Sequence, residues 1–474
     1  MSSPNDEIEP SSNRGASPPG AVIDAPVAAT PVAATPGSSA DPAAPPNGNG
    51  GGNGTANGTG NGTANGTGNG NGALTRKESR ARANRRKKRW ITFGVLALVA
   101  ALLVPVGANY VHDLRAPGTD SMGARTVEWM REHGFGPMVN QIERWWYTKN
   151  APPKGGTPEG GLPSAKAPTS AAVGRIPTDL ALLVGSVKQT LLPTTTPPKA
   201  MQPFVDTPLP GEGTWEATGR TVLGTPAVYT AFMRPDPIHT SLVAGFMWMD
   251  PKLLKAVHVP GLKEPAGAPQ KYGAQIPNEL RPSTVAAFNS AFRLDDARGG
   301  FWDEGTEVRP LVPGQATLTI DKDGRADVVA WGRDRNVDAN LAQARQNLAL
   351  VVDNGVSAAG LDSEATTKWG ATVGNQVLVW RSGIGVDRNG GLIYIAGPGL
   401  SVNQLAELFL RAGAVRAMEL DINSDWTTAY IFEQTDPNNA AAIIGNKLLP
   451  DMKRGGDRYL VPGERDFVTM VARY

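Results

Sequence analysis

A short acidic segment near the C-terminus carries the residues of this sequence that are best suited to chemistry. The segment from Val415 to Trp426 reads VRAMELDINSDW and follows a stretch with helical spacing. If the apolar residues of a strand face the core, the period of two places Glu419, Asp421 and Asn423 on the opposite face, with successive side chains about 6.8 Å apart. Two carboxylates and an amide would then line one surface at a strand end. An ordinary solvated strand face fits the same pattern.

Two further segments end in arginine or asparagine after an apolar run. Arg381 follows Val377–Trp380 and precedes small residues that would let a ligand approach closely. A guanidinium there suits a phosphate, because its planar fork can donate two hydrogen bonds to two oxygens. Asn289 and Arg293 follow another apolar run in the same way. A structural ion pair for Arg381 and a turn-closing role for Asn289 are equally consistent with these patterns.

Several common catalytic machineries are absent from the sequence. It has no G-x-S-x-G elbow, no Walker A loop, no H-E-x-x-H motif and no cysteine. Only His239 and His258 fall in the expected folded domain, and they are isolated, so a Ser-His-Asp triad or a histidine-rich metal site has little support. We therefore predict no cofactor and no metal; carboxylates can recruit a hard cation, but no spacing resembles an EF-hand loop. Carboxylate, arginine and amide chemistry remains.

The sequence pattern around these residues predicts an α+β domain, with a mixed, mostly antiparallel sheet and flanking helices. Helices are predicted at Asp338–Leu350 and at Ser401–Ala412, the second with a serine N-cap and a glycine stop. Hairpin turns are predicted at Asp321–Gly324 and Asp387–Gly390. Strands are predicted by β-rich runs between turn signals at Ala227–Met233, Leu242–Met249, Val285–Asn289, Ala316–Ile320, Ala326–Trp331, Val377–Trp380, Leu392–Ala396 and Val415–Ile422.

The N-terminal part of the chain predicts a membrane anchor. Residues 76–89 carry nine Lys or Arg against one acid and precede an uncharged run at 91–111, which is long enough to cross a bilayer. The basic cluster predicts that residues 1–74, a disordered low-complexity tail, stay in the cytoplasm and that the C-terminal domain lies outside the cell. The rival is a cleaved signal peptide, but a leader of about 90 residues before the apolar run is far too long.

The other boundaries follow shifts in composition. The membrane-proximal stretch is predicted to be helical, and a spacer, a lipid-surface helix or a dimerisation helix would all fit it. Outside residues 76–89 the chain has 37 basic and 43 acidic residues, so nucleic-acid binding is not predicted; the oligomeric state is left open. The predicted segments are a basic juxtamembrane stretch at 75–90, a helical stalk at 112–150, a Pro/Gly-rich linker and entry segment at 151–200, and the folded domain at 201–474.

The three chemistry-bearing segments, in this order, resemble the phosphodiester glycosidase family, the bacterial relatives of the animal enzyme that uncovers mannose 6-phosphate by removing N-acetylglucosamine. The resemblance covers roughly residues 201–474. An Asn-Gly-Gly-Phe-Phe-like turn is matched by Asn289–Arg293, and an Arg-Thr-Ala-Ile-Gly-like segment by Arg381–Gly385. A Leu-Asp-Gly-Gly-Gly-Ser-like strand end is matched by Leu420–Ser424, and Arg465–Phe467 resembles the family's closing strand.

This sequence departs from the family pattern at four glycines. Ser290 and Ala291 replace two of them, and Ile422 and Asn423 replace two others. Each replacement adds side-chain bulk at the expected pocket.

The resemblance implies a membrane-anchored extracytoplasmic hydrolase that cleaves sugar-1-phosphodiester linkages in envelope or exopolysaccharide glycans. Arg381, with Arg293, would neutralise the phosphate leaving group, which needs little protonation. Asp421 or Glu419 would act as base or nucleophile through an oxocarbenium-like transition state.

The implied partners are a phosphorylated envelope glycan and, through residues 91–111, the membrane. Asn289 and Asn423 would hold sugar hydroxyls. The alternative function is a non-catalytic envelope glycan-binding module on the same fold, which the lost glycines favour. A third is a scaffold whose cytoplasmic tail meets a partner.

Overall fold

The computed structural model describes residues 76–172, 194–361, 369 and 378–474. The tail predicted at 1–74 lies outside the described residues, as does part of the linker predicted at 151–200.

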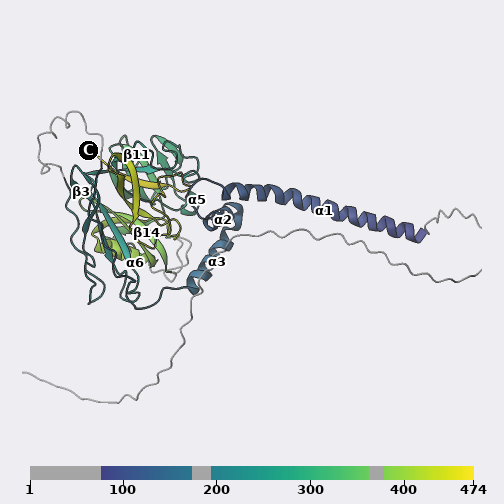
Figure 1. The fold of residues 1–474 in the computed structure, drawn as a ribbon, viewed down its shortest axis with the longest axis horizontal. Helices are drawn as coiled ribbons and strands as arrows, with labels where there is room; N and C mark the ends of the chain where they lie inside the picture. The colour runs from purple at the N-terminus through teal and green to yellow at the C-terminus, as the bar shows by residue number, and fades with distance from the viewer. Residues whose placement is uncertain (1–75, 173–193, 362–368, 370–377) are drawn as a thin grey trace, which may run out of the picture. The chain divides into compact units, whose positions relative to one another are not determined.

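One long helix, α1 (Arg76–Leu114), contains the apolar run predicted at 91–111 (Figure 1). The stretch Arg80–Leu114 is long and apolar enough to cross a membrane, by length and composition. Its apolar side chains, such as Leu98 and Leu102, are exposed. The helix therefore fits a membrane anchor, and its orientation across a membrane stays a prediction.

Three short helical segments occupy most of the predicted stalk at 112–150. They are α2 (Met122–Met130), the π-helical turn η1 (Arg131–Phe135) and α3 (Gly136–Lys149). The Ser121 hydroxyl caps α2 by accepting a hydrogen bond from the Ala124 N–H. The helical path is broken within η1, where Gly134 adopts a positive φ of 84°.

The largest sheet has nine strands, and all its pairs are antiparallel except β1–β2. In spatial order its strands are β1 (Ala171–Ala172), β2 (Glu216–Val222), β3 (Thr225–Met233), β4 (Ala244–Met249), β15 (Leu392–Leu400), β14 (Val379–Asp387), β16 (Ala414–Glu419), β12 (Leu350–Asp353) and β13 (Val356–Ser357).

Two antiparallel five-stranded sheets complete the described β-structure. One has the order β10 (Ala326–Ala330), β9 (Ala316–Asp321), β11 (Leu341–Gln346), β7 (Phe301–Asp303) and β8 (Thr306–Arg309). The other has the order β18 (Asn439–Lys447), β17 (Ala429–Asp436), β6 (Thr284–Asn289), β19 (Phe467–Ala472) and β5 (Leu254–Val259). Short helices η3 (Arg281–Ser283) and α5 (Leu294–Ala297) flank β6.

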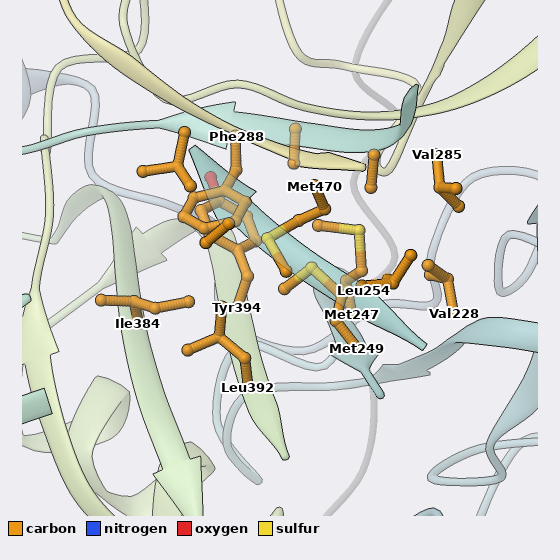
Figure 2. Packing of buried hydrophobic residues seen from close by; sticks show 14 of the residues in the cluster. Val228, Met247, Met249, Leu254, Val285, Phe288, Ile384, Leu392, Tyr394 and Met470 are labelled. Atoms are coloured by element: carbon orange, nitrogen blue, oxygen red, sulfur yellow. The ribbon is translucent and has the colours of Figure 1, made fainter. Parts of the chain in front are cut away.

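The main core joins one face of the nine-stranded sheet to both smaller sheets. Met247 and Tyr394 from the large sheet pack in one buried cluster with Phe288 and Met470 from the second small sheet and Leu318 from the first. Figure 2 shows the Phe288 and Tyr394 rings beside one another, with centroids 5.2 Å apart. Sheet-on-sheet packing thus fixes the ends of β6, β14, β16 and β19 relative to one another.

The opposite face of the large sheet is covered by α6 (Val402–Arg411), which confirms the helix predicted at Ser401–Ala412. Ser401 and Gln404 form a capping box, and Gly413 ends the helix at a φ of 84°. The hairpins predicted at Asp321–Gly324 and Asp387–Gly390 are also confirmed, because β9 pairs with β10 and β14 with β15.

The helix predicted at Asp338–Leu350 is wrong. This segment forms β11 and the start of β12, and β11 lies between β9 and β7. In β11 the side chains of Gln343 and Arg345 are buried and hydrogen-bond to β5 and to Asp466 just before β19, so contacts distant in sequence overrode the local helical spacing. The predicted fold class is correct in its coarser form, because the described residues form mixed, mostly antiparallel sheets with few helices.

Candidate active site

Arg381 and Glu419 form a buried ion pair between neighbouring strands. Arg381 lies in β14 and Glu419 at the end of β16, and their side chains are 1% and 0% exposed. The Arg381 Nη1 donates to Glu419 Oε1, and its Nε donates to the Leu400 carbonyl at 2.9 Å. Burial raises the pKa of Glu419 to about 7, against the opposing attraction of Arg381. These two predicted site residues therefore meet, but they bind each other.

The glycines after Arg381 are closed by the protein itself. A Cβ on Gly383 would lie 2.7 Å from the Phe409 ring of α6, and one on Gly385 would lie 3.0 Å from the same ring. Phe409 of α6 therefore occupies the space where a ligand was expected to approach. The absence of a side chain at these two glycines is what lets α6 pack against β14.

Asp421 leaves the strand that carries Glu419. Strand β16 ends at Glu419, and the Asp421 N–H donates to the Ser290 carbonyl at 3.2 Å, in the turn after β6. The predicted common face of Glu419, Asp421 and Asn423 therefore does not form. Asp421 and Asn423 instead line a cavity of ≈ 710 Å³, whereas Glu419 does not.

The wall of this cavity combines strand ends with the membrane-proximal helices. It is built from the turn after β6, the segment after β16, the start of the β19 segment and one side of α2, η1 and α3. Its charged and polar side chains include those of Arg293, Asp421, Asn423, Arg465, Glu128 and Asn140.

Arg465 is the central cation of the cavity. Its Nη2 donates to Asp421 Oδ2 at 2.6 Å and to the Ala291 carbonyl at 3.3 Å, while its Nη1 donates to Glu128 Oε1 at 3.3 Å. Burial lowers the pKa of Arg465, but Asp421 and Glu128 outweigh it and hold the guanidinium charged. Sequence reasoning placed Arg465 only in a closing strand; its role depends on a partner 44 residues away.

The Asp421 carboxylate is held in place at both oxygens. Its Oδ1 accepts from the Asn423 N–H at 2.9 Å, and its Oδ2 accepts from Arg465. Burial raises the pKa of Asp421 to about 6, although Arg465 and the Asn423 hydrogen bond pull it down. A carboxyl poised near neutral pH inside a cavity is suited to general base chemistry.

Arg293 is the second cation of the cavity. Its Nη1 contacts Glu128 Oε2 at 3.3 Å, and its Nε contacts Asp296 Oδ2 at 2.8 Å. Burial lowers the pKa of Arg293, but Asp296 and Glu128 outweigh this effect and raise the pKa above its ordinary value. Arg293 and Asp421, both predicted as site residues, line the same cavity.

Asn289 is a buried junction between strands. Its Oδ1 accepts from the Tyr394 hydroxyl at 2.7 Å and the Thr428 N–H at 3.1 Å, and its Nδ2 donates to Ser382 Oγ at 3.0 Å. Ser382 in turn donates to the Asp421 carbonyl at 2.8 Å. Asn289 therefore ties together the ends of β6, β14 and β16 and is absent from the lining of the large cavity.

A buried histidine lies beside this region, although sequence spacing gave no sign of it. His258 in β5 contacts Asp466 at 2.9 Å and Ser290 Oγ at 3.4 Å through the same ring nitrogen, Nε2. Arg345 also binds Asp466 at 2.9 Å; burial raises the pKa of Asp466, but Arg345 and His258 hold it well below its ordinary value. Because Asp466 and Ser290 share one nitrogen, this cluster lacks the geometry of a Ser-His-Asp triad.

Within the described ranges, no group of three or more potential metal-ligating His, Cys, Asp or Glu side chains is found. The cavity chemistry on the described residues is thus one of guanidinium groups, carboxylates and amides.

At its strand ends, this mainly antiparallel β domain gathers two arginines and a carboxylate whose pKa is raised by burial. Residues 283–446 match the model of the phosphodiester glycosidase family. This match confirms, over residues 283–446, the resemblance seen in the sequence.

Two solved structures are similar to the chain at low identity. One is the zebrafish N-acetylglucosamine-1-phosphodiester alpha-N-acetylglucosaminidase catalytic domain, auto-inhibited by its pro-peptide: 14% identity, TM-score 0.34, covering 54% of this chain and 88% of that one. The other is a hypothetical protein from Synechocystis: 12% identity, TM-score 0.32, covering 56% of this chain and 64% of that one. None of the curated proteins matches the chain.

Proposed function

We propose that the domain hydrolyses sugar-1-phosphodiesters at the anomeric carbon, and that the cavity lined by Asp421, Arg293 and Arg465 is its active site. The observation that carries this proposal is the direct contact of Arg465 with Asp421 inside a cavity that also receives Arg293. An anion-binding group and a carboxylate are thereby held side by side, as a glycosyl phosphate requires.

In this mechanism the two guanidinium groups bind the phosphoryl oxygens of the diester. The bond between the anomeric carbon and the phosphate oxygen breaks, and the phosphomonoester leaves with its electron pair. Arg293 and Arg465 neutralise the leaving charge, so no general acid is needed. Asp421 accepts a proton from the water that attacks the anomeric carbon and later returns it to solvent.

In this proposal the buried pair Arg381–Glu419 has a structural role and no catalytic one. Both side chains are sealed beneath α6 and neither lines the cavity. Asn289 likewise orients the strand ends, through Ser382 and the Asp421 carbonyl, while Asn423 remains a candidate for a sugar hydroxyl because it lines the cavity.

The proposed setting is the outer side of a membrane, with α1 as the anchor and a phosphorylated envelope or exopolysaccharide glycan as substrate. The basic flank at 76–89 and the apolar stretch within Arg80–Leu114 support the anchor and its orientation. The arginines of the cavity support an anionic glycan.

The test is hydrolysis of the methyl diester of α-N-acetylglucosamine 1-phosphate in ¹⁸O-water by the full chain in detergent. We expect release of methyl phosphate without ¹⁸O, because water attacks carbon and not phosphorus. Mass spectrometry of the methyl phosphate reads the result. Incorporation of ¹⁸O into the phosphate would replace the glycosidase with a phosphodiesterase, and tight binding without any product would favour the glycan-binding module.

A further inference from the structure

A carboxylate of the chain itself occupies the space between the two cavity arginines. Glu128 of α2 accepts from Arg465 and from the Trp426 indole N–H through Oε1, at 3.3 and 3.2 Å. Its other oxygen, Oε2, accepts from Arg293 Nη1 at 3.3 Å. The Glu128 side chain is 8% exposed, so this is a built site and not a surface contact. Three donors converging on two oxygens is the arrangement that a phosphoryl group requires.

The charges of the cavity do not admit Glu128 and a phosphodiester together. With Glu128 in place, Arg293 and Arg465 face three carboxylates, those of Glu128, Asp296 and Asp421. A further anion would enter a cluster whose carboxylates already outnumber its guanidinium groups. If the Glu128 carboxylate moves out of the cavity, a phosphodiester with one negative charge can take its place. The total charge of the cluster is then unchanged, and the phosphoryl oxygens accept from the donors that had bound Glu128.

Ionic contacts join both ends of the helix that carries Glu128 to the domain. Asp120, just before α2, lies 3.4 Å from Arg454 and 3.8 Å from Arg458. Glu132, just after α2, lies 3.4 Å from Lys263. The Asp120 pairs are buried, with side chains 0–4% exposed, whereas the Glu132–Lys263 pair is partly exposed, is screened by salt and contributes little to the docking of α2.

We propose that Glu128 is an internal competitor for the phosphoryl position, so that an anionic ligand enters only when α2 withdraws this carboxylate. This inference rests on the proposed function for the identity of the ligand. The apparent affinity for phosphate is then reduced by the fraction of molecules in which the site is occupied by Glu128. The membrane-proximal segment and the active site are thereby coupled.

The experiment measures inorganic phosphate binding by calorimetry to the full chain in detergent. Glu128→Gln keeps the size and one acceptor oxygen but removes the charge, and we expect phosphate to bind at least about tenfold more tightly than to wild type. The matched control is Glu132→Gln, which removes the same charge from the same segment but contacts Lys263 outside the cavity. Its phosphate affinity should stay within about twofold of wild type.

Two further readouts locate the effect. Phosphate should increase amide hydrogen exchange across Met122–Met130 in wild type, because binding displaces α2. Adding Arg293→Ala to Glu128→Gln should abolish the gained affinity. Unchanged or weaker phosphate binding in Glu128→Gln overturns the inference, as does equal tightening in Glu132→Gln.

Turnover separates this inference from the proposed function. With the methyl diester, Glu128→Gln should lower KM and leave kcat within about threefold, since the carboxylate competes with substrate and takes no part in the reaction. Loss of turnover in Glu128→Gln would make Glu128 a participant and contradict the inference. Tighter phosphate binding with no turnover in any variant, wild type included, would sustain the competition and reject only the hydrolase.

Discussion

Two carboxylates that are two residues apart in the sequence each pair with an arginine, but the two pairs lie in opposite environments. Glu419 pairs with Arg381 between β16 and β14, sealed under α6 with both side chains nearly inaccessible. Asp421 pairs with Arg465 on the wall of a ≈ 710 Å³ cavity. The same chemistry thus serves packing in one place and faces a ligand space in the other.

The difference arises where β16 ends. Up to Glu419 the chain is paired with β14, and beyond it the Asp421 N–H turns to the carbonyl of Ser290. This change of partner moves Asp421 out of the sheet and toward Arg465. Residue type and spacing are therefore insufficient to identify a functional carboxylate; the end of its strand decides which face it reaches.

The largest expected effect separates the two carboxylates by activity. Asp421→Asn should lower kcat by about 10³-fold because it removes the proposed base. Glu419→Gln should leave kcat within about threefold in the folded protein, since Glu419 lies outside the cavity. Steady-state turnover of the methyl diester measures both. A folded Asp421→Asn enzyme with more than about a tenth of wild-type kcat would break the comparison.

A large effect on stability is expected at the other pair. Glu419→Ala leaves the Arg381 guanidinium without its carboxylate partner in the core, and should lower the free energy of unfolding by about 3–5 kcal/mol. Urea denaturation followed by tryptophan fluorescence measures this change. A loss below about 1 kcal/mol would mean that Glu419 is not a structural partner.

Substitution of the two arginines should likewise affect activity in one case and stability in the other. Arg465→Lys retains the charge but cannot span Asp421 and an anionic ligand, so kcat/KM should fall about 10- to 100-fold. Arg381→Lys should lower stability while kcat/KM of the folded fraction stays within about threefold. Kinetics paired with denaturation measures both variants, and equal kinetic losses at the two positions would erase the distinction.

The smallest expected effects concern pH. Because burial raises the pKa of Asp421 to about 6, kcat/KM should fall as pH drops below about 6 and level off above about 7. Glu419 holds its proton more tightly in the folded state, with a pKa of about 7 against an ordinary 4.5. Its stabilising contribution is therefore complete below pH 4.5 and is lost as pH rises through 7.

Glu419→Gln provides the control for the second pH effect. The variant should lose less stability than wild type between pH 4.5 and 7, because it lacks the group that titrates there. Parallel unfolding curves for the two proteins over this range would show that Glu419 keeps an ordinary pKa.

Local signals in the sequence predicted the local structure well. Ser401 and Gly413 mark the ends of α6, and the Asp-Gly and Asn-Gly turns mark two hairpins; each depends on residues a few positions apart. The segment Asp338–Leu350 failed because its burial is set by β9 and β7, which no local pattern reveals.

The candidate site could be predicted only in part for the same reason. Arg293 was singled out because it follows an apolar strand, and Asp421 because it alternates with apolar residues in one; both line the cavity. Arg381 and Glu419 carried the same signal but pair with each other. Glu128 could not be found, since it approaches Arg465 across 337 residues from a segment that looked like a spacer.

The most direct test is a crystal structure of the chain with a non-hydrolysable glycosyl phosphonate ester. The account predicts phosphonate oxygens within about 3.2 Å of Arg293 and Arg465, the anomeric carbon facing Asp421, and Glu128 displaced. A phosphonate bound against Arg381 and Glu419, with Asp421 and Glu128 still paired with Arg465, would contradict it.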